Sequence, residues 1–170
     1  MSTIAVSTIF HLNKMNGNEN LYDLLKETFI LLDDGDRRLF SQFNLTPPRF
    51  YALSHISEEP GLSSSRLSER LLCDKSNVTR IVKGLESKGY IQRQPHETDG
   101  RTLRLFLTQK GTAVLQQVQT AHTQFNQTRI DSIDTHSQAQ LQHHLTQLNS
   151  SLVTALWEKK KTPAQNGNNG

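Results

Sequence analysis

The sequence predicts a mainly helical α+β fold with one small β-hairpin, on the strength of three observations. Residues 74–87 carry an apolar stripe at helical spacing, formed by Val78, Ile81, Val82 and Leu85. Directly after it, the apolar-rich runs 90–93 and 102–107 flank a turn-forming segment, 95–100, and so predict two paired strands. Further amphipathic segments precede and follow this unit. A helix followed by a hairpin with a basic tip is the outline of a winged helix-turn-helix, with a β-hairpin wing.

Composition restricts the class of protein. A chain of 170 residues, 34% apolar and 21% charged, is long and apolar enough for one folded domain with a core. The formal net charge is only +3, so a nucleic-acid partner has to be inferred from where the charges cluster. No apolar run approaches the ~20 residues of a membrane helix, and no basic residue precedes Lys14, so we expect neither a membrane span nor a secretion signal. The single cysteine, Cys73, fits a reducing cytoplasm.

Both ends of the chain are expected to be irregular. Residues 1–20 contain an Asn-Gly-Asn cluster and predict a flexible arm, in which Met15 is an alternative start. Residues 162–170 contain no core residue and predict a disordered tail. The folded part is therefore expected to be residues 21–161. Its first element, 21–43, has the apolar spacing of an amphipathic helix, and the acidic cluster 33–36 with its glycine predicts a kink or a break.

The next segments predict a helix-turn-helix. Thr46 followed by two prolines is a helix start, with Thr46 as N-cap, and Pro60-Gly61 ends that helix. Ser63 then caps a short helix, whose expected inward residues are Leu67, Leu71 and Leu72. Cys73 and Asp74 form the turn into the helix of residues 74–87. Two short helices joined tightly, the second with a polar outer face, are typical of this motif.

The outer face of that second helix is polar and cationic. Opposite the apolar stripe lie Ser76, Arg80, Lys83 and Ser87, with Asn77 and Thr79 on the flanks. No carboxylate occurs among these six side chains, whereas a merely solvated helix face mixes both signs. The pattern favours a helix that lies in the DNA major groove.

The carboxyl half predicts two further helices. Thr108 to Gly111 starts a long one with the stripe Val114, Leu115, Val118, Ala121 and Phe125. Residues 132–137 interrupt it, and a last helix runs to about residue 161 with a narrow leucine seam. Such a seam requires a partner helix, so we expect a homodimer in which 21–43 and 108–161 are dimerisation helices around the DNA-binding lobe 46–110.

Several linked motifs resemble the MarR family of bacterial transcription regulators. They are LSSSRLSERL at 62–71, DKSNVTR at 74–80, GLESKGYIQR at 84–93, DGR at 99–101 and LTQKG at 107–111. The resemblance covers about residues 46–125. Departures from the family pattern are Tyr90 in place of an aliphatic residue, a longer amino arm and a Gln-rich carboxyl half.

The resemblance implies a cytoplasmic homodimer that binds double-stranded DNA at a pseudo-palindromic operator and acts as a repressor. It also implies a small effector, often an aromatic or phenolic acid, bound between the DNA-binding lobe and the dimer helices. The candidate pocket residues are Tyr22, Phe29, Arg49, His55 and His122. No cofactor is implied.

The candidate DNA-contacting residues are Ser63, Lys75, Ser76, Asn77, Thr79, Arg80, Lys83, Arg93, Asp99 and Arg101. Arginine can bridge guanine O6 and N7, asparagine can pair with adenine, and hydroxyls reach phosphates or base edges. Arg101 at the wing tip is expected to enter the minor groove, with Asp99 orienting it. Arg93, Lys83 and Lys88 are expected to position the DNA backbone, although Lys88 also fits a solvated residue.

Alternatives remain open at this point. Cys73 could make the protein redox-responsive, although a small partly buried residue explains it as well. The winged helix could serve as a protein-docking module without DNA binding. An accessory domain of an enzyme would need a catalytic domain for which no residues are left. We find no catalytic motif, and the adjacent His143 and His144 project about 100° apart on a helix, so we expect no metal site.

Overall fold

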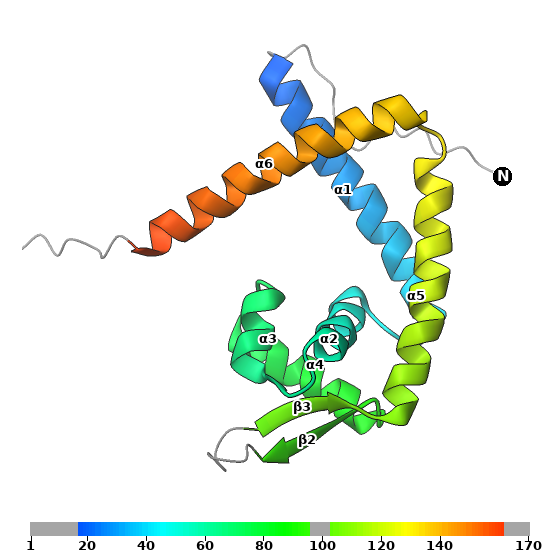
Figure 1. The fold of residues 1–170 in the computed structure, drawn as a ribbon, viewed down its shortest axis with the longest axis vertical. Coiled ribbons are helices and arrows are strands. Elements are labelled where there is room, and N and C mark those ends of the chain that lie inside the picture. The colour runs from blue at the N-terminus through cyan, green and yellow to red at the C-terminus, as the bar shows by residue number, and fades with distance from the viewer. Residues whose placement is uncertain (1–16, 96–102, 162–170) are drawn as a thin grey trace, which may run out of the picture. The chain divides into compact units, whose positions relative to one another are not determined.

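The structure is a computed structural model of the 170-residue chain, and it describes residues 17–95 and 103–161 (Figure 1). The chain forms two compact units, residues 1–123 and residues 124–170. The predicted tail, most of the predicted arm and the turn of the wing lie outside the described residues. Within the part that is described, no helix is long and apolar enough to cross a membrane.

Helix α1, Gly17–Ser41, differs from the prediction in two respects. It begins at Gly17, so the expected arm of residues 1–20 was drawn too long by one helical turn. It also runs without a break through the acidic cluster at 33–36, where a break was the second alternative. Ion pairs spaced i,i+4 span this region, from Arg37 to Asp33 at 2.6 Å and from Arg38 to Asp34 at 2.8 Å. Such pairs support a helix and offset the cost of the glycine within it.

The helix-turn-helix forms as predicted. Helix α2, Pro47–Glu58, starts behind the extended N-cap Thr46 and has proline in its first turn. Helix α3, Ser64–Arg70, is capped by the Ser63 hydroxyl, which accepts a hydrogen bond from the Arg66 amide at 3.2 Å. Helix α4, Lys75–Ser87, buries Val78, Val82 and Leu85, while Ile81 is partly buried against the same core.

One inward prediction in this region was wrong. Leu67 is buried and Leu71 packs against the core, but Leu72 is 81% exposed. Helix α3 ends at Arg70, and Leu72 takes a left-handed φ of 50° in the following turn. The helical period therefore stops before it reaches Leu72.

The wing belongs to a three-stranded antiparallel sheet. Strand β2, Ile91–Pro95, pairs with β3, Leu103–Leu107, in a register that sets Ile91 opposite Leu107 (Figure 1). A two-residue strand, β1 at Leu62–Ser63, adds to the other edge of β3 and gives the order β1-β3-β2. Sequence periodicity cannot reveal so short a strand, and β1 was not predicted.

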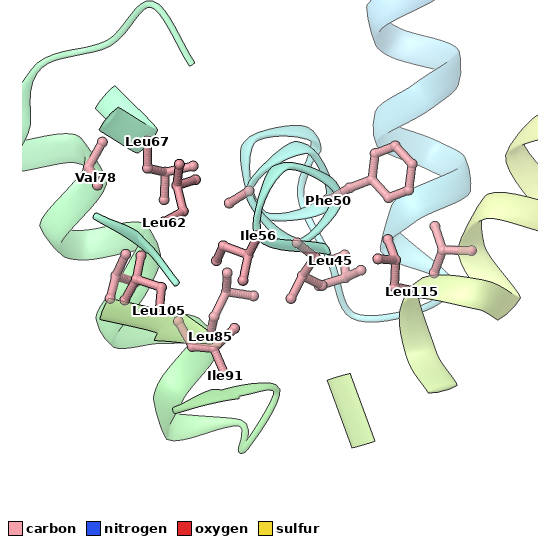
Figure 2. Packing of buried hydrophobic residues seen from close by; sticks show 14 of the residues in the cluster. Leu45, Phe50, Ile56, Leu62, Leu67, Val78, Leu85, Ile91, Leu105 and Leu115 are labelled. Atoms are coloured by element: carbon pink, nitrogen blue, oxygen red, sulfur yellow. The ribbon is translucent and has the colours of Figure 1, made fainter. Parts of the chain in front are cut away.

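One apolar core joins these elements, with contributions from α1 to α5 and from all three strands. Figure 2 shows Leu62, Val78 and Leu105 at one end of this core and Phe50 and Leu115 at the other. The fully buried Phe40 of α1 stacks on Phe50 of α2 with ring centroids 4.4 Å apart. Burial of this apolar surface is the main stabilising term and holds α4 firmly on its inner face.

Helix α5, Gln109–Ile130, buries Gly111, Leu115 and Val118 in the first unit. The second unit contains the end of α5 and helix α6, Thr135–Lys161. Their connection is shorter than the predicted 132–137, because Asp134 caps α6 by accepting hydrogen bonds from the amides of His136 and Ser137, both at 3.1 Å. The leucine seam of α6 is exposed on this unit, at Leu141, Leu145, Leu148 and Leu152.

Candidate nucleic-acid interface

Helix α4 is the element that presents the candidate DNA-contacting side chains. It packs through its apolar stripe against α2, α3 and β2, which leaves the opposite face free. Its first turn is fixed by Asp74, whose side chain accepts a hydrogen bond from the Asn77 amide at 2.8 Å. Aspartate is among the preferred N-cap residues because it satisfies an amide that has no partner within the helix.

Asp74 also organises the polar side chains around it. Its carboxylate accepts a hydrogen bond from the Ser76 hydroxyl at 2.6 Å and one from Asn77 Nδ2 at 3.0 Å. The Asn77 carbonyl oxygen in turn accepts a hydrogen bond from Arg80 Nη2. These hydrogen bonds, first from Ser76 and then from the Asn77 amide, lower the pKa of Asp74. Asp74, Asn77 and Arg80 therefore form a relay that runs up the outer side of α4.

The outer face of α4 is exposed and cationic, as the sequence predicted. Lys75, Ser76, Thr79, Arg80 and Lys83 are exposed, and Asn77 is half-buried. Among the described residues, none of the three cations on this face makes an ion pair. Thr79 donates its hydroxyl to the Lys75 carbonyl at 2.8 Å, so its oxygen is left as an acceptor for an outside donor. The face combines free positive charge with hydrogen-bonding groups at a helix amino end, which suits phosphate and base edges.

Three other predicted contacts stand differently. Arg93 on β2 forms an ion pair with Glu86 on α4 at 2.6 Å and is only 28% exposed, so its charge is already neutralised. Ser63 uses its hydroxyl as the cap of α3. Lys88 donates to the Asn44 carbonyl at 3.1 Å and thereby ties the end of α4 to the turn after α1. Asp99 and Arg101 lie outside the described residues.

A groove adjoins the amino-terminal half of α4. Its volume is about 960 Å³, and it is lined by residues of α1, α2, α4 and the turns next to them. Two of the five predicted pocket residues line it, Phe29 and Arg49. Two residues of the DNA-facing set, Asn77 and Arg80, line it as well.

The other three predicted pocket residues lie elsewhere. Tyr22 is 60% exposed on α1, and Lys26 lies over its ring at 5.9 Å. His55 contacts Glu58 on its own helix at 3.2 Å. His122 packs between Phe40 and Phe50, with centroids at 5.0 and 5.3 Å, and its Nε2 is 3.4 Å from Asp36. His122 touches the groove only indirectly, through Asp36, which is one of the lining residues.

Comparison with known proteins agrees with this geometry. The sequence model of the MarR family matches residues 43–102, the part that contains α2, α3, α4 and the wing. Residues 43–102 make this chain a member of the MarR family. The chain is also 33% identical over 95 residues to the uncharacterized HTH-type transcriptional regulator YybA of Bacillus subtilis, an alignment that covers 54% of this chain and 63% of YybA.

Solved structures of MarR-like proteins share the fold. A putative MarR-like regulator of Bacillus cereus matches with a TM-score of 0.72 at 21% identity, covering 79% of this chain and 97% of that one. A MepR–DNA complex from Staphylococcus aureus matches with a TM-score of 0.69 at 19% identity, covering 81% and 99%. At this identity the likeness shows the MarR fold. The chain spans between 38% and 63% of the length of the first curated relatives that it matches.

Cys73 lies in the turn before α4 and lines the groove. Burial raises the pKa of its thiol, and the negative charge of Asp74 adds to this effect. Because the thiolate is the reactive form of cysteine, this environment disfavours the redox alternative. Among the described residues, no three or more His, Cys, Asp or Glu side chains come together in a way that could hold a metal ion.

Sequence reasoning missed Asp74 as a member of the site. It was read as part of a turn, although an aspartate directly before an apolar-periodic segment is a recognised N-cap signal. Its role in holding Asn77 and Arg80 follows from side-chain geometry, which sequence spacing alone does not give.

Proposed function

We propose that this chain is a DNA-binding transcriptional regulator that inserts α4 into the major groove of double-stranded DNA. The observation that carries the proposal is the exposed, unpaired cationic face of α4, held in place by the Asp74 cap. The regulator titles of its MarR-family relatives and the DNA bound to a protein of the same fold support it. The proposal includes no catalytic step.

The proposed active form is a cytoplasmic homodimer that acts as a repressor. Helix α1 exposes Leu21, Leu24, Phe29 and Ile30, and α6 exposes its leucine seam. Apolar faces of this extent favour burial against a second copy. Two copies of α4 would then enter successive major grooves about one helical turn, ~34 Å, apart, so the operator should be an inverted repeat.

We further propose that the groove beside α4 binds a small effector. It has apolar walls, with Phe29, Leu32 and Ile81 among its lining residues, and arginines at positions suited to an acidic group. A ligand that favours a dimer with a different spacing of the two α4 helices would weaken operator binding.

The proposal is tested by selecting duplexes from random DNA with the purified protein at fixed, moderate salt. Arg80→Ala removes a cation from the α4 face, and Arg38→Ala serves as the matched control. Arg38 is exposed on α1, where it pairs with Asp34. We expect an inverted repeat to be enriched by the wild type and by Arg38→Ala, and to be lost with Arg80→Ala.

Absence of any enrichment by a folded, dimeric wild type would overturn the proposal and favour the protein-docking module instead. Sedimentation of the same samples tests the dimer independently. A monomeric protein that still enriches a single half-site would contradict the homodimer but not the DNA binding.

A further inference from the structure

The groove contains two arginines that lack a carboxylate partner among the described residues, Arg49 and Arg80. The carboxylates that line it face other cationic or titratable groups. Asp33 pairs with Arg37 at 2.6 Å, and Asp36 contacts His122 at 3.4 Å. The groove therefore presents uncompensated positive charge next to apolar walls.

Arg49 is held in the groove by the shape of α4. Its guanidinium lies against Gly84, where an added Cβ would be 2.5 Å from Nη2 and 3.1 Å from Cζ. The missing side chain at position 84 gives the guanidinium room beside the helix backbone. Arg49 itself is half-buried, and a half-buried arginine without a hydrogen-bond acceptor is a strong site for an anion. A small organic anion with an apolar body fits this combination of charge and apolar wall.

Arg80 belongs to the groove and to the DNA-facing side of α4 at the same time. In the structure its Nη2 donates to the amide oxygen of Asn77, which is a neutral acceptor. Charge-assisted hydrogen bonds to a carboxylate are roughly twice as strong as neutral ones. A carboxylate in the groove would therefore draw the guanidinium away from the relay with Asn77.

We propose that an organic anion held by Arg49 and DNA held by α4 compete for the same Arg80 side chain. This inference rests on the proposed function for its DNA arm, and it specifies how the ligand acts. Release of DNA then begins with the loss of one shared contact within each subunit, and it does not require the half-site spacing to change first. By thermodynamic linkage, the operator must weaken anion binding by the same factor by which the anion weakens operator binding.

The first test needs no DNA. Sodium benzoate serves as the probe anion and benzamide as its neutral counterpart, and both are titrated calorimetrically into the full-length protein. We expect benzoate to bind and benzamide to bind much more weakly. Arg49→Gln and Arg80→Gln should each weaken benzoate binding about tenfold or more, as the loss of one charge-assisted contact requires. Arg38→Gln, on α1 outside the groove lining, should bind benzoate as the wild type does.

Arg49→Lys shows whether the result reflects charge or folding. It keeps the charge and loses the bidentate geometry, so its benzoate affinity should fall between those of the wild type and Arg49→Gln. Thermal unfolding of every variant is recorded alongside, so that only folded proteins are compared.

The second test uses the duplex enriched by selection, with sodium chloride exchanged for sodium benzoate at constant total sodium. The ratio of operator Kd values with and without benzoate should fall close to one in Arg49→Gln. Arg80→Gln should lose affinity for both operator and benzoate.

An Arg80→Gln protein that binds benzoate like the wild type but has lost the operator would overturn the inference, because Arg80 would then serve DNA only. Wild-type protein that selects an operator and binds no benzoate would overturn it as well, while leaving the proposed DNA binding intact. Benzoate binding that needs both arginines in a protein that selects no operator would retain the anion site and overturn the competition.

Discussion

Gly111 of α5 lies directly against the backbone carbonyl of Tyr90, so closely that a Cβ at position 111 would be 1.9 Å from that oxygen. This contact joins the start of α5 to the segment between α4 and the wing. Thr108 strengthens the junction, since its hydroxyl donates to the Gly89 carbonyl at 2.6 Å and accepts a hydrogen bond from the Gly111 amide at 3.0 Å. The Leu-Thr-Gln-Lys-Gly sequence at 107–111 thus locks the end of α4 and the wing onto α5.

Replacing Gly111 by alanine should be strongly destabilising. The overlapping atom belongs to the backbone of Tyr90 and cannot rotate away, so α5 or the wing must shift. We expect a loss of about 3 kcal/mol, at the upper end for overpacking in a core. Urea unfolding followed by circular dichroism measures it. A Gly111→Ala protein as stable as the wild type would contradict the contact.

Replacing Gly84 by alanine should have the opposite effect on stability. Its added Cβ meets the end of the Arg49 side chain, which is flexible and can move, while alanine favours the helix by about 0.5–1 kcal/mol. The displaced guanidinium should bind benzoate less well. We therefore expect a higher urea midpoint together with weaker benzoate binding by calorimetry. Unchanged benzoate affinity would show that Arg49 does not depend on the space at position 84.

The charge on Asp74 should stabilise the protein in a pH-dependent way. Hydrogen bonds from Ser76 and the Asn77 amide lower its pKa in the folded state. The resulting stability is fully present above the ordinary aspartate pKa of about 3.9 and is lost as the pH falls through the lower, folded-state value. Asp74→Asn should therefore have a lower urea midpoint than the wild type at neutral pH.

The gap between the two midpoints should narrow as the pH falls below about 4, where both states of the wild type begin to take up the proton. Asp134, whose pKa is also lowered, is present in both proteins and cancels in the comparison. A gap that is independent of pH would rule out the charge as its cause.

Cys73 should react slowly at neutral pH. Burial, and then the charge of Asp74, raise the pKa of its thiol, so the reactive thiolate is scarce. We expect its alkylation by iodoacetamide to be slower than that of free cysteine, and Asp74→Asn to accelerate it. Peroxide should leave operator binding unchanged. Faster reaction than free cysteine, with loss of operator binding on oxidation, would restore the redox alternative.

The recognition helix could be predicted from the sequence because its signals are local. Asp74 at its start, the stripe from Val78 to Leu85 and Gly89 at its end each act within a few residues. Gly89 takes a φ of +70°, which glycine adopts at little cost. Predictions failed where local signals compete: the ion pairs of Arg37 and Arg38 outweigh Gly35 in α1, and the end of α3 at Arg70 interrupts the period before Leu72.

The site was predicted as a set of residues, and their partners were not. Arg80 and Asn77 were both placed on the outer face of α4, which is where they lie. Nothing in their spacing shows that the Asn77 carbonyl accepts from Arg80, or that Arg93 is paired with Glu86. Exposed polar side chains have many acceptors within reach, and the choice among them depends on rotamers and neighbouring elements.

By itself the sequence determined the helix-turn-helix, the wing strands and the cationic face of α4, because periodicity, caps and turn residues act over one or two turns of chain. Only the tertiary structure decided that β1 joins β3, that Arg49 lies beside Gly84, and that Arg80 borders a groove shared with α1. Those contacts join residues far apart in the chain, and they form only when the common core packs the elements together.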